Sequence, residues 1–424
     1  MGRHRGSATR RRGRTTAYAL TATLLCATPA LAQSTGGSDP ASGRSDAGSG
    51  RSDVAPRLGP PPPGVKVRPA PALHSWSCLR DCAEIALART GSVVRLRGRG
   101  LGLAYEVVFE GAEGDADDVA AATFRRRRTR ADVRVPLGAV AGPLVVADRD
   151  GQRSRAEAPI EIAPTAAPLA AGAPPTVEVQ ARAPRAFFDA DRAATVAYVV
   201  HGGAPTHVLV ELVRERDGVV IANWQAPNVP PEAPQTLAWD GTAGGRVQRP
   251  GRYSFRVSAE SAAGLRAVSS AAPPTSNVPD PAEFVFLNHA FPIRGPHGYG
   301  EHAATFGGGR GHQGQDVFAA CGTPLVAARG GVVQFKQYHG RAGHYIVIDG
   351  HETGTDYAYM HLRDAALVDE GDRVRTGQRI GYVGDTGSAD GCHLHLEEWS
   401  APGWYTGGQP FDPLPDLKAW DAQS

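Results

Sequence analysis

Side chains that can bind a metal ion are concentrated in the last third of the chain. Ten of the 14 histidines in this 424-residue sequence lie between positions 289 and 395. Three short segments of that stretch, residues 310–316, 359–362 and 391–397, place histidine close to glycine, an aromatic residue or a carboxylate. Imidazole together with carboxylate is a donor set suited to Zn²⁺, and three protein ligands leave a fourth position for water. These segments therefore predict a catalytic zinc site.

The first segment needs a bend to bring its two donors together. His312 and Asp316 are four residues apart, and the glycines around them make a helix improbable. In a straight strand the two residues would lie about 13 Å apart, which is too far for one ion. We therefore expect the chain to bend between them, and Gly314 is the natural place for the bend.

The third segment has the alternation of a half-buried strand. His393 and His395 alternate with Leu394 and Leu396, so both imidazoles face one side, about 6.6 Å apart along the backbone. One of them can bind a metal while the other points at the adjacent water or substrate. The spacing leaves open which histidine does which.

Eight motifs in this region occur in a recognisable order. They are His312-x3-Asp316, Cys321-Gly322-Thr323-Pro324, Gly330-Gly331-Val332-Val333, Tyr359-x-His361-Leu362, Gly371-Asp372-x-Val374, Gly377-Gln378-x-Ile380-Gly381, Gly384-x-Thr386-Gly387 and His393-Leu394-His395. Together they resemble the M23 (lysostaphin- and LytM-like) zinc endopeptidases of bacterial cell walls. The resemblance implies one Zn²⁺ per chain with His312, Asp316 and His395 as ligands, and His361 and His393 as the catalytic pair. It also implies an antiparallel-β, duplicated-hybrid-motif-like domain over residues 288–413.

The expected chemistry is hydrolysis of peptide crosslinks in peptidoglycan. Zinc activates water and polarises a carbonyl, and a histidine can move the proton from the water to the leaving amine. The sequence has no His-Glu-x-x-His helix, so an imidazole takes the place of a carboxylate base. Glu397 either orients a ligand or forms an ordinary surface salt bridge. The alternative function is a non-catalytic wall-binding scaffold or an activator of other wall hydrolases.

The remaining histidines and the cysteines have structural interpretations. Five other histidines of the region are expected in exposed loops: His289, His297, His302, His339 and His351. Outside the first 32 residues there are four cysteines, Cys78, Cys82, Cys321 and Cys392. An even number in a secreted protein suggests two disulfides, and each neighbouring pair is expected to close locally, although three pairings are formally open.

The N-terminal residues indicate the compartment. Six arginines and no acidic residue precede an apolar run and Ala30-Leu31-Ala32, which is typical of a signal peptide over residues 1–32. A retained N-terminal anchor is the alternative. Without these arginines the formal net charge falls from +2 to −4, so a nucleic-acid partner is not expected. We expect a secreted, cell-wall-associated monomer with no membrane-spanning segment in the mature chain.

The rest of the chain is expected to be all-β. Residues 33–72 are a disordered linker rich in Ser, Gly and Pro, and residues 164–175 form a second linker. Residues 73–163 resemble an immunoglobulin-like module of the transcription-factor (IPT/TIG) type. Residues 176–281 resemble the immunoglobulin-like module of flagellar hook-capping proteins, with Trp239, Tyr253 and Phe255 expected in the core. The predicted architecture is two β-sandwich modules followed by the peptidase domain.

Overall fold

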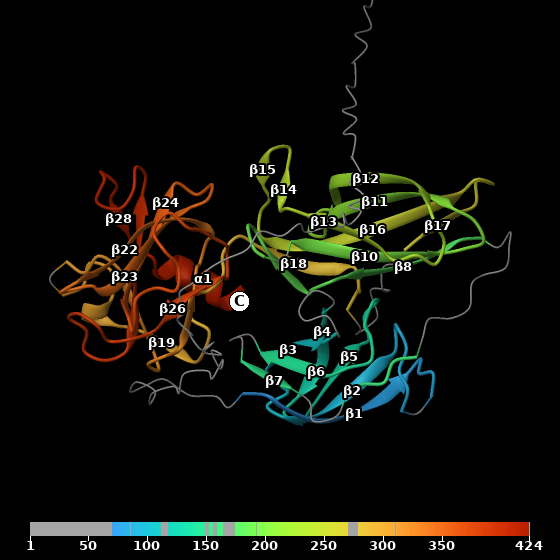
Figure 1. Cartoon of the computed structure of the whole chain (residues 1–424), viewed down its shortest axis with the longest axis horizontal. Coiled ribbons are helices and arrows are strands. Elements are labelled where there is room, and N and C mark those ends of the chain that lie inside the picture. The colour runs from blue at the N-terminus through green and yellow to red at the C-terminus, as the bar shows by residue number, and fades with distance from the viewer. Residues whose placement is uncertain are drawn as a thin grey trace, which may run out of the picture. The chain divides into compact units, whose positions relative to one another are not determined.

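The structure is a computed structural model of the chain. It describes residues 70–84, 86–111, 118–148, 152–155, 159–163, 174–191, 193–269, 279–309 and 311–423. The predicted signal peptide, almost all of the first linker and most of the second lie outside the described residues. Strands dominate the described part of the chain, and every pair of named strands in it is antiparallel except β9 with β18 (Figure 1).

The first module is built on one sheet of seven strands in the order β1-β2-β5-β4-β3-β6-β7. Its strands are β1 (Ala72–Arg80), β2 (Val93–Arg99), β3 (Ala104–Phe109), β4 (Val119–Arg127), β5 (Arg130–Arg134), β6 (Leu144–Asp148) and β7 (Arg153–Arg155). Strand β4 pairs with β3 through residues 119–122 and with β5 through residues 123–127. Apolar side chains from both sides of β4 in this strand order, such as Leu96 of β2 and Val146 of β6, share one core.

The second module has two main sheets and one small hairpin. Its strands are β8 (Thr176–Ala181), β9 (Arg185–Phe187), β10 (Ala194–His201), β11 (Thr206–Arg214), β12 (Val219–Val229), β13 (Gln235–Trp239), β14 (Thr242–Ala243), β15 (Arg246–Val247), β16 (Gly251–Ser261), β17 (Arg266–Val268) and β18 (Glu283–Leu287). The sheet orders are β13-β10-β8 and β12-β11-β16-β18-β9, and β17 pairs with β16. The predicted core residues Trp239, Tyr253 and Phe255 are buried between these sheets, which confirms that prediction.

The C-terminal domain holds every candidate site residue. Its elements are β19 (His297–Tyr299), a 3-10 turn (His302–Ala304), β20 (Gln315–Ala319), β21 (Pro324–Val326), β22 (Gly331–His339), β23 (Gly343–Gly350), β24 (Thr355–Leu362), β25 (Arg373–Val374), β26 (Arg379–Tyr382), β27 (His393–Ser400), β28 (Pro410–Phe411) and α1 (Leu414–Gln423). The main sheet runs β19-β20-β27-β24-β23-β22-β25, with β28 on β27, while β21 pairs with β26. The predicted antiparallel-β domain is therefore confirmed.

Two central strands of this sheet position the site. Leu394 and Leu396 of β27 are fully buried in the apolar core, and Tyr359 of β24 joins them there. Because neighbouring residues of a strand face opposite sides, His393 and His395 project from the other face of β27. The alternation predicted for β27 is thus confirmed. The immunoglobulin-like assignment of the two upstream modules stays a prediction.

No helix in the described part of the chain is both long enough and apolar enough to span a lipid bilayer.

Candidate metal centre and active site

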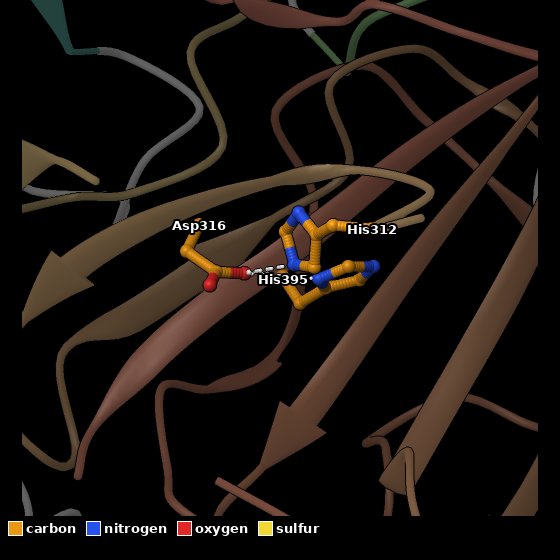
Figure 2. Close-up of side chains that lie close together, drawn as sticks. All are labelled: His312, Asp316 and His395. Carbon is orange, nitrogen blue, oxygen red and sulfur yellow. Dashed lines mark hydrogen bonds and ion pairs between the residues drawn. The ribbon is translucent and has the colours of Figure 1, made fainter. Parts of the chain in front are cut away.

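The three predicted metal ligands meet at the junction of β20 and β27. Asp316 lies directly opposite His395 in the antiparallel register of these strands. Asp316 Oδ1 is 3.2 Å from His312 Nε2 and 2.9 Å from His395 Nδ1. One ligand atom of each residue lies within 4.8 Å of the others, and Figure 2 shows the three side chains directed toward one another. Two imidazole nitrogens and one carboxylate oxygen at this spacing fit a zinc ion.

Gly314 allows His312 to reach Asp316. The chain bends there, immediately before β20, as the spacing of the two ligands predicts. A Cβ atom at position 314 would lie 2.3 Å from the Leu396 carbonyl oxygen and 2.7 Å from His395 Nε2. No side chain fits in that space, so the close approach of the two segments requires glycine.

A backbone carbonyl fixes the orientation of His312. Its Nδ1 lies 3.0 Å from the carbonyl oxygen of Thr305. A carbonyl oxygen only accepts hydrogen bonds, so Nδ1 donates to it, and Nε2 would present its lone pair to a metal bound beside Asp316. Thr305 belongs to no motif, and nothing in the sequence marks its carbonyl as part of the site.

Glu397 contacts the ligand His395. His395 Nε2 is 3.1 Å from Glu397 Oε1, and Glu397 is only 4% exposed. Of the two alternatives that the sequence leaves open for Glu397, the structure therefore supports the contact with a ligand and excludes a surface salt bridge.

The two predicted catalytic histidines lie beside this cluster. The ring centroids of His361 and His393 are 4.7 Å apart, and those of His361 and His395 are 6.0 Å apart. His393 Nε2 is 3.6 Å from Asp316 Oδ1. The structure thus brings all five predicted site residues together from three strand regions that are distant in sequence.

His361 occupies an unusual backbone conformation. Its φ angle is +62°, in the left-handed region that residues other than glycine rarely adopt. Its backbone N–H donates to the Ala342 carbonyl, where β24 leaves its regular pairing with β23. Such conformations occur preferentially at functional sites. Here the conformation accompanies the placement of the imidazole beside His393.

Thr386 supports His361 and has no role in the prediction from sequence. His361 Nδ1 lies 2.8 Å from the Thr386 carbonyl oxygen, so Nδ1 is the protonated nitrogen and Nε2 is free to accept a proton. The Thr386 hydroxyl donates to the Leu362 carbonyl and accepts from the backbone N–H of His344. The only signal is the Gly384-x-Thr386-Gly387 motif, which indicates the family but not this role. His393 Nδ1 similarly faces the Gly391 carbonyl at 2.9 Å.

The charges of the site favour a cation at the ligand cluster. Burial raises the pKa of Asp316, but hydrogen bonds with His312 and His395 outweigh it and hold that pKa below its usual range. Burial lowers the pKa of His395, yet Asp316 and Glu397 together raise it to about 9. A positive charge between these two carboxylates is thus stabilised even without a metal.

The charge state of His361 differs from that of His395. Burial, with a smaller contribution from the neighbouring His393, lowers the pKa of His361 to about 4. The ring is therefore neutral near pH 7, and its Nε2 is able to act as a proton acceptor.

Comparison with known proteins places this site in a family. Residues 310–413 match the sequence model of peptidase family M23. This part of the chain is an M23 peptidase domain. The chain is 43% identical over 86 residues to the peptidoglycan DD-endopeptidase ShyC of Vibrio cholerae, covering 20% of this chain and 19% of that protein. It is 37% identical over 122 residues to the DD-carboxypeptidase/endopeptidase Mpg of Neisseria meningitidis, covering 29% and 26% respectively.

A solved structure is also similar to part of this chain. The catalytic domain of lysostaphin from Staphylococcus simulans shares 31% identity, with 29% of this chain and 91% of that domain covered and a TM-score of 0.26. The chain spans about a fifth to a quarter of the length of the two curated relatives named above.

A disulfide braces the M23 domain beside the site. Cys321, just after β20, is bonded to Cys392, which immediately precedes His393. Cys78 and Cys82 form the second disulfide. Both local pairs predicted from the sequence are confirmed, and neither supplies a thiolate to the metal cluster.

The prediction for the other histidines of the M23 region is partly wrong. His302 and His339 are exposed, but His289, His297 and His351 are half-buried. His289, for example, stacks on Trp420 at a centroid distance of 4.7 Å. A neutral imidazole is flat and only weakly polar across its faces, so it packs against aromatic rings in positions that sequence spacing does not reveal.

Proposed function

We propose that the protein is a zinc endopeptidase that hydrolyses peptide crosslinks of peptidoglycan outside the cytoplasm. The observation that carries the proposal is the convergence of two complete sets of groups. His312, Asp316 and His395 form a donor set for zinc, and His361 and His393 lie beside it. A scaffold that only binds the wall has no need of both sets.

The roles of the residues follow from the ring nitrogen that each histidine presents to the site. Zinc in such a site supplies water activation and carbonyl polarisation. His361 is neutral and presents Nε2, so it accepts the proton of the attacking water and returns it to the leaving amine. His393 donates from Nδ1 to the Gly391 carbonyl, so it would stabilise the negative charge that develops on the carbonyl oxygen as an imidazolium, through a second N–H at Nε2.

The substrate class rests on the relatives. ShyC and Mpg are both named for endopeptidase activity, and ShyC is named for peptidoglycan. Their similarity covers 20% and 29% of this chain, and a peptide crosslink is the substrate that we propose. The two upstream modules are proposed to be immunoglobulin-like spacers, in a secreted monomer.

Digestion of purified peptidoglycan tests this function. We expect the purified protein to release crosslink-derived muropeptide fragments that are identified by mass spectrometry, and a chelator to stop the release. Asp316→Ala serves as the matched inactive variant. A protein that sediments with sacculi, carries zinc and yet releases no fragment would instead be a binding scaffold.

A further inference from the structure

We propose that Glu397, held in place by two tryptophan indoles, is a positioning residue that sets the orientation of the zinc ligand His395. The inference builds on the proposed zinc site but not on any particular substrate. It takes up the interpretation of Glu397 as a partner of a ligand and adds Trp399 and Trp404, which belong to none of the motifs of the sequence analysis.

The two carboxylate oxygens of Glu397 contact different partners. Its Oε1 faces His395 Nε2 at 3.1 Å, while Oε2 accepts hydrogen bonds from the indole Nε1 of Trp399 at 2.7 Å and of Trp404 at 3.1 Å. Glu397, Trp399 and His395 are all less than 10% exposed. Both oxygens of the carboxylate are thus used in a site from which water is largely excluded.

The chemistry of the donors determines the orientation. An indole N–H only donates, so the group opposite the two tryptophans must be an acceptor. Glu397 therefore presents a carboxylate oxygen to His395, and His395 Nε2 must donate to it. When a metal displaces the proton of Nδ1, the lone pair of that nitrogen would be the one left for the metal, on the side where Asp316 Oδ1 lies 2.9 Å away. Such contacts around a metal ligand fix its tautomer and its ring orientation.

The loop that carries Trp404 also reaches the other side of the metal cluster. The backbone N–H of Trp404 donates to Asp356 Oδ2 at 2.8 Å, which anchors the loop to β24. The next residue, Tyr405, donates its hydroxyl to Gln313 Oε1 at 2.8 Å, beside the ligand His312. Tyr405 also packs against Trp404 with ring centroids 4.7 Å apart. One loop thus contacts Glu397, which supports His395, and Gln313, which is next to His312 in the chain.

Glu397→Gln is a sharp test because it keeps the size of the side chain. The amide has one acceptor oxygen and one donor NH₂. If its oxygen faces the indoles, the NH₂ faces His395 Nε2 and reverses the hydrogen bond; if its oxygen faces His395, the NH₂ opposes two indole N–H groups. The first arrangement loses the hydrogen bond to His395, and the second loses the indole hydrogen bonds that hold residue 397 in place. Trp404→Phe removes one indole donor while retaining an aromatic ring.

Zinc affinity and the absorption spectrum of the cobalt-substituted protein are the readouts. We expect Glu397→Gln to weaken zinc binding by about 10–100-fold in competition with a chelator, and to change the Co²⁺ d–d bands. Trp404→Phe should act in the same direction by a smaller factor. Glu398→Gln is the matched control, because the adjacent Glu398 projects from the opposite face of β27.

The result has two clear outcomes. Wild-type zinc affinity and an unchanged Co²⁺ spectrum in folded Glu397→Gln would overturn the inference. If Glu397→Gln does not fold, the same two measurements on Trp404→Phe decide it. Neither readout requires peptidoglycan hydrolysis, so failure of the proposed activity and failure of this inference are distinguishable.

Discussion

Asp316 and His395 lie opposite each other on paired antiparallel strands, with Asp316 Oδ1 2.9 Å from His395 Nδ1. The register of β20 and β27 therefore places a carboxylate against an imidazole in the middle of the sheet, and the bend at Gly314 adds His312. The proposed metal site is a consequence of strand pairing, with one candidate ligand supplied by the loop before β20.

Removal of the central carboxylate should empty the site. We expect the purified wild-type protein to contain about one zinc per chain, and Asp316→Ala to lose most of it, because the variant replaces the only charged ligand with a methyl group. Metal analysis by plasma mass spectrometry measures the difference. Full zinc occupancy in Asp316→Ala would show that the ligand assignment is wrong.

A methyl group at position 314 should separate the two strands that hold the ligands. The Cβ of Gly314→Ala would lie 2.3 Å from the Leu396 carbonyl oxygen, and overpacking of this kind typically destabilises a protein by about 1–3 kcal/mol. We expect a lower melting temperature and weaker zinc binding. Gly340→Ala is the control, because a Cβ at that position meets no atom within 4 Å. Equal behaviour of the two variants would contradict the packing argument.

The two disulfides should differ in their contribution to stability. Cys321 and Cys392 are 71 residues apart, whereas Cys78 and Cys82 are four apart. The chain-entropy relation gives about 4 kcal/mol for the long loop and about 2 kcal/mol for the short one. Chemical denaturation of two double variants, Cys321→Ala with Cys392→Ala and Cys78→Ala with Cys82→Ala, tests this order. A larger loss from removing Cys78–Cys82 would disagree with it.

The buried Glu398 should make the stability depend on pH. Burial, together with Asp416 and Asp412, raises the pKa of Glu398 to about 9, compared with an ordinary value of 4.5. Between these two values the folded state holds a proton that the unfolded state releases, so Glu398 makes the protein less stable as the pH rises from about 5 to 9. Glutamine lacks this titration.

Thermal melts of Glu398→Gln measure this effect. We expect the difference in melting temperature, Glu398→Gln minus wild type, to increase progressively from pH 5 to pH 9. Glu370→Gln, at an exposed position, is the control and should follow the wild type throughout. A constant difference across this range would argue against a buried, protonated Glu398.

The sequence was sufficient to predict which candidate side chains the fold brings together, but not the groups that hold them. The ligand pair His312 and Asp316 required a bend that glycine alone permits, and the alternation around His393 and His395 predicted β27. The supports of these residues could not be predicted in the same way. The carbonyls of Thr305 and Thr386 act through the backbone, where residue type carries no signal.

The contact between the two indoles and Glu397 could not be predicted from the sequence either. Trp404 lies seven residues from Glu397, in a loop that has to turn back before its N–H reaches the carboxylate. Spacing along a strand predicts neighbours on one face but does not predict the return of a loop. For the same reason Glu397 could be interpreted from the sequence either as a partner of a ligand or as a surface group.

The most direct test of the central claim separates metal binding from catalysis. His361 lies beside the ligand cluster but is not one of its three ligands. We expect His361→Ala to keep its zinc and its fold while its release of dye from labelled sacculi falls by about 10²–10⁴-fold, as is typical when a proton-transfer or charge-stabilising group is lost. His339→Ala, at an exposed position of the same domain, should retain both zinc and activity. Loss of zinc from His361→Ala would make His361 a ligand, and hydrolysis at the wild-type rate would contradict the proposed mechanism.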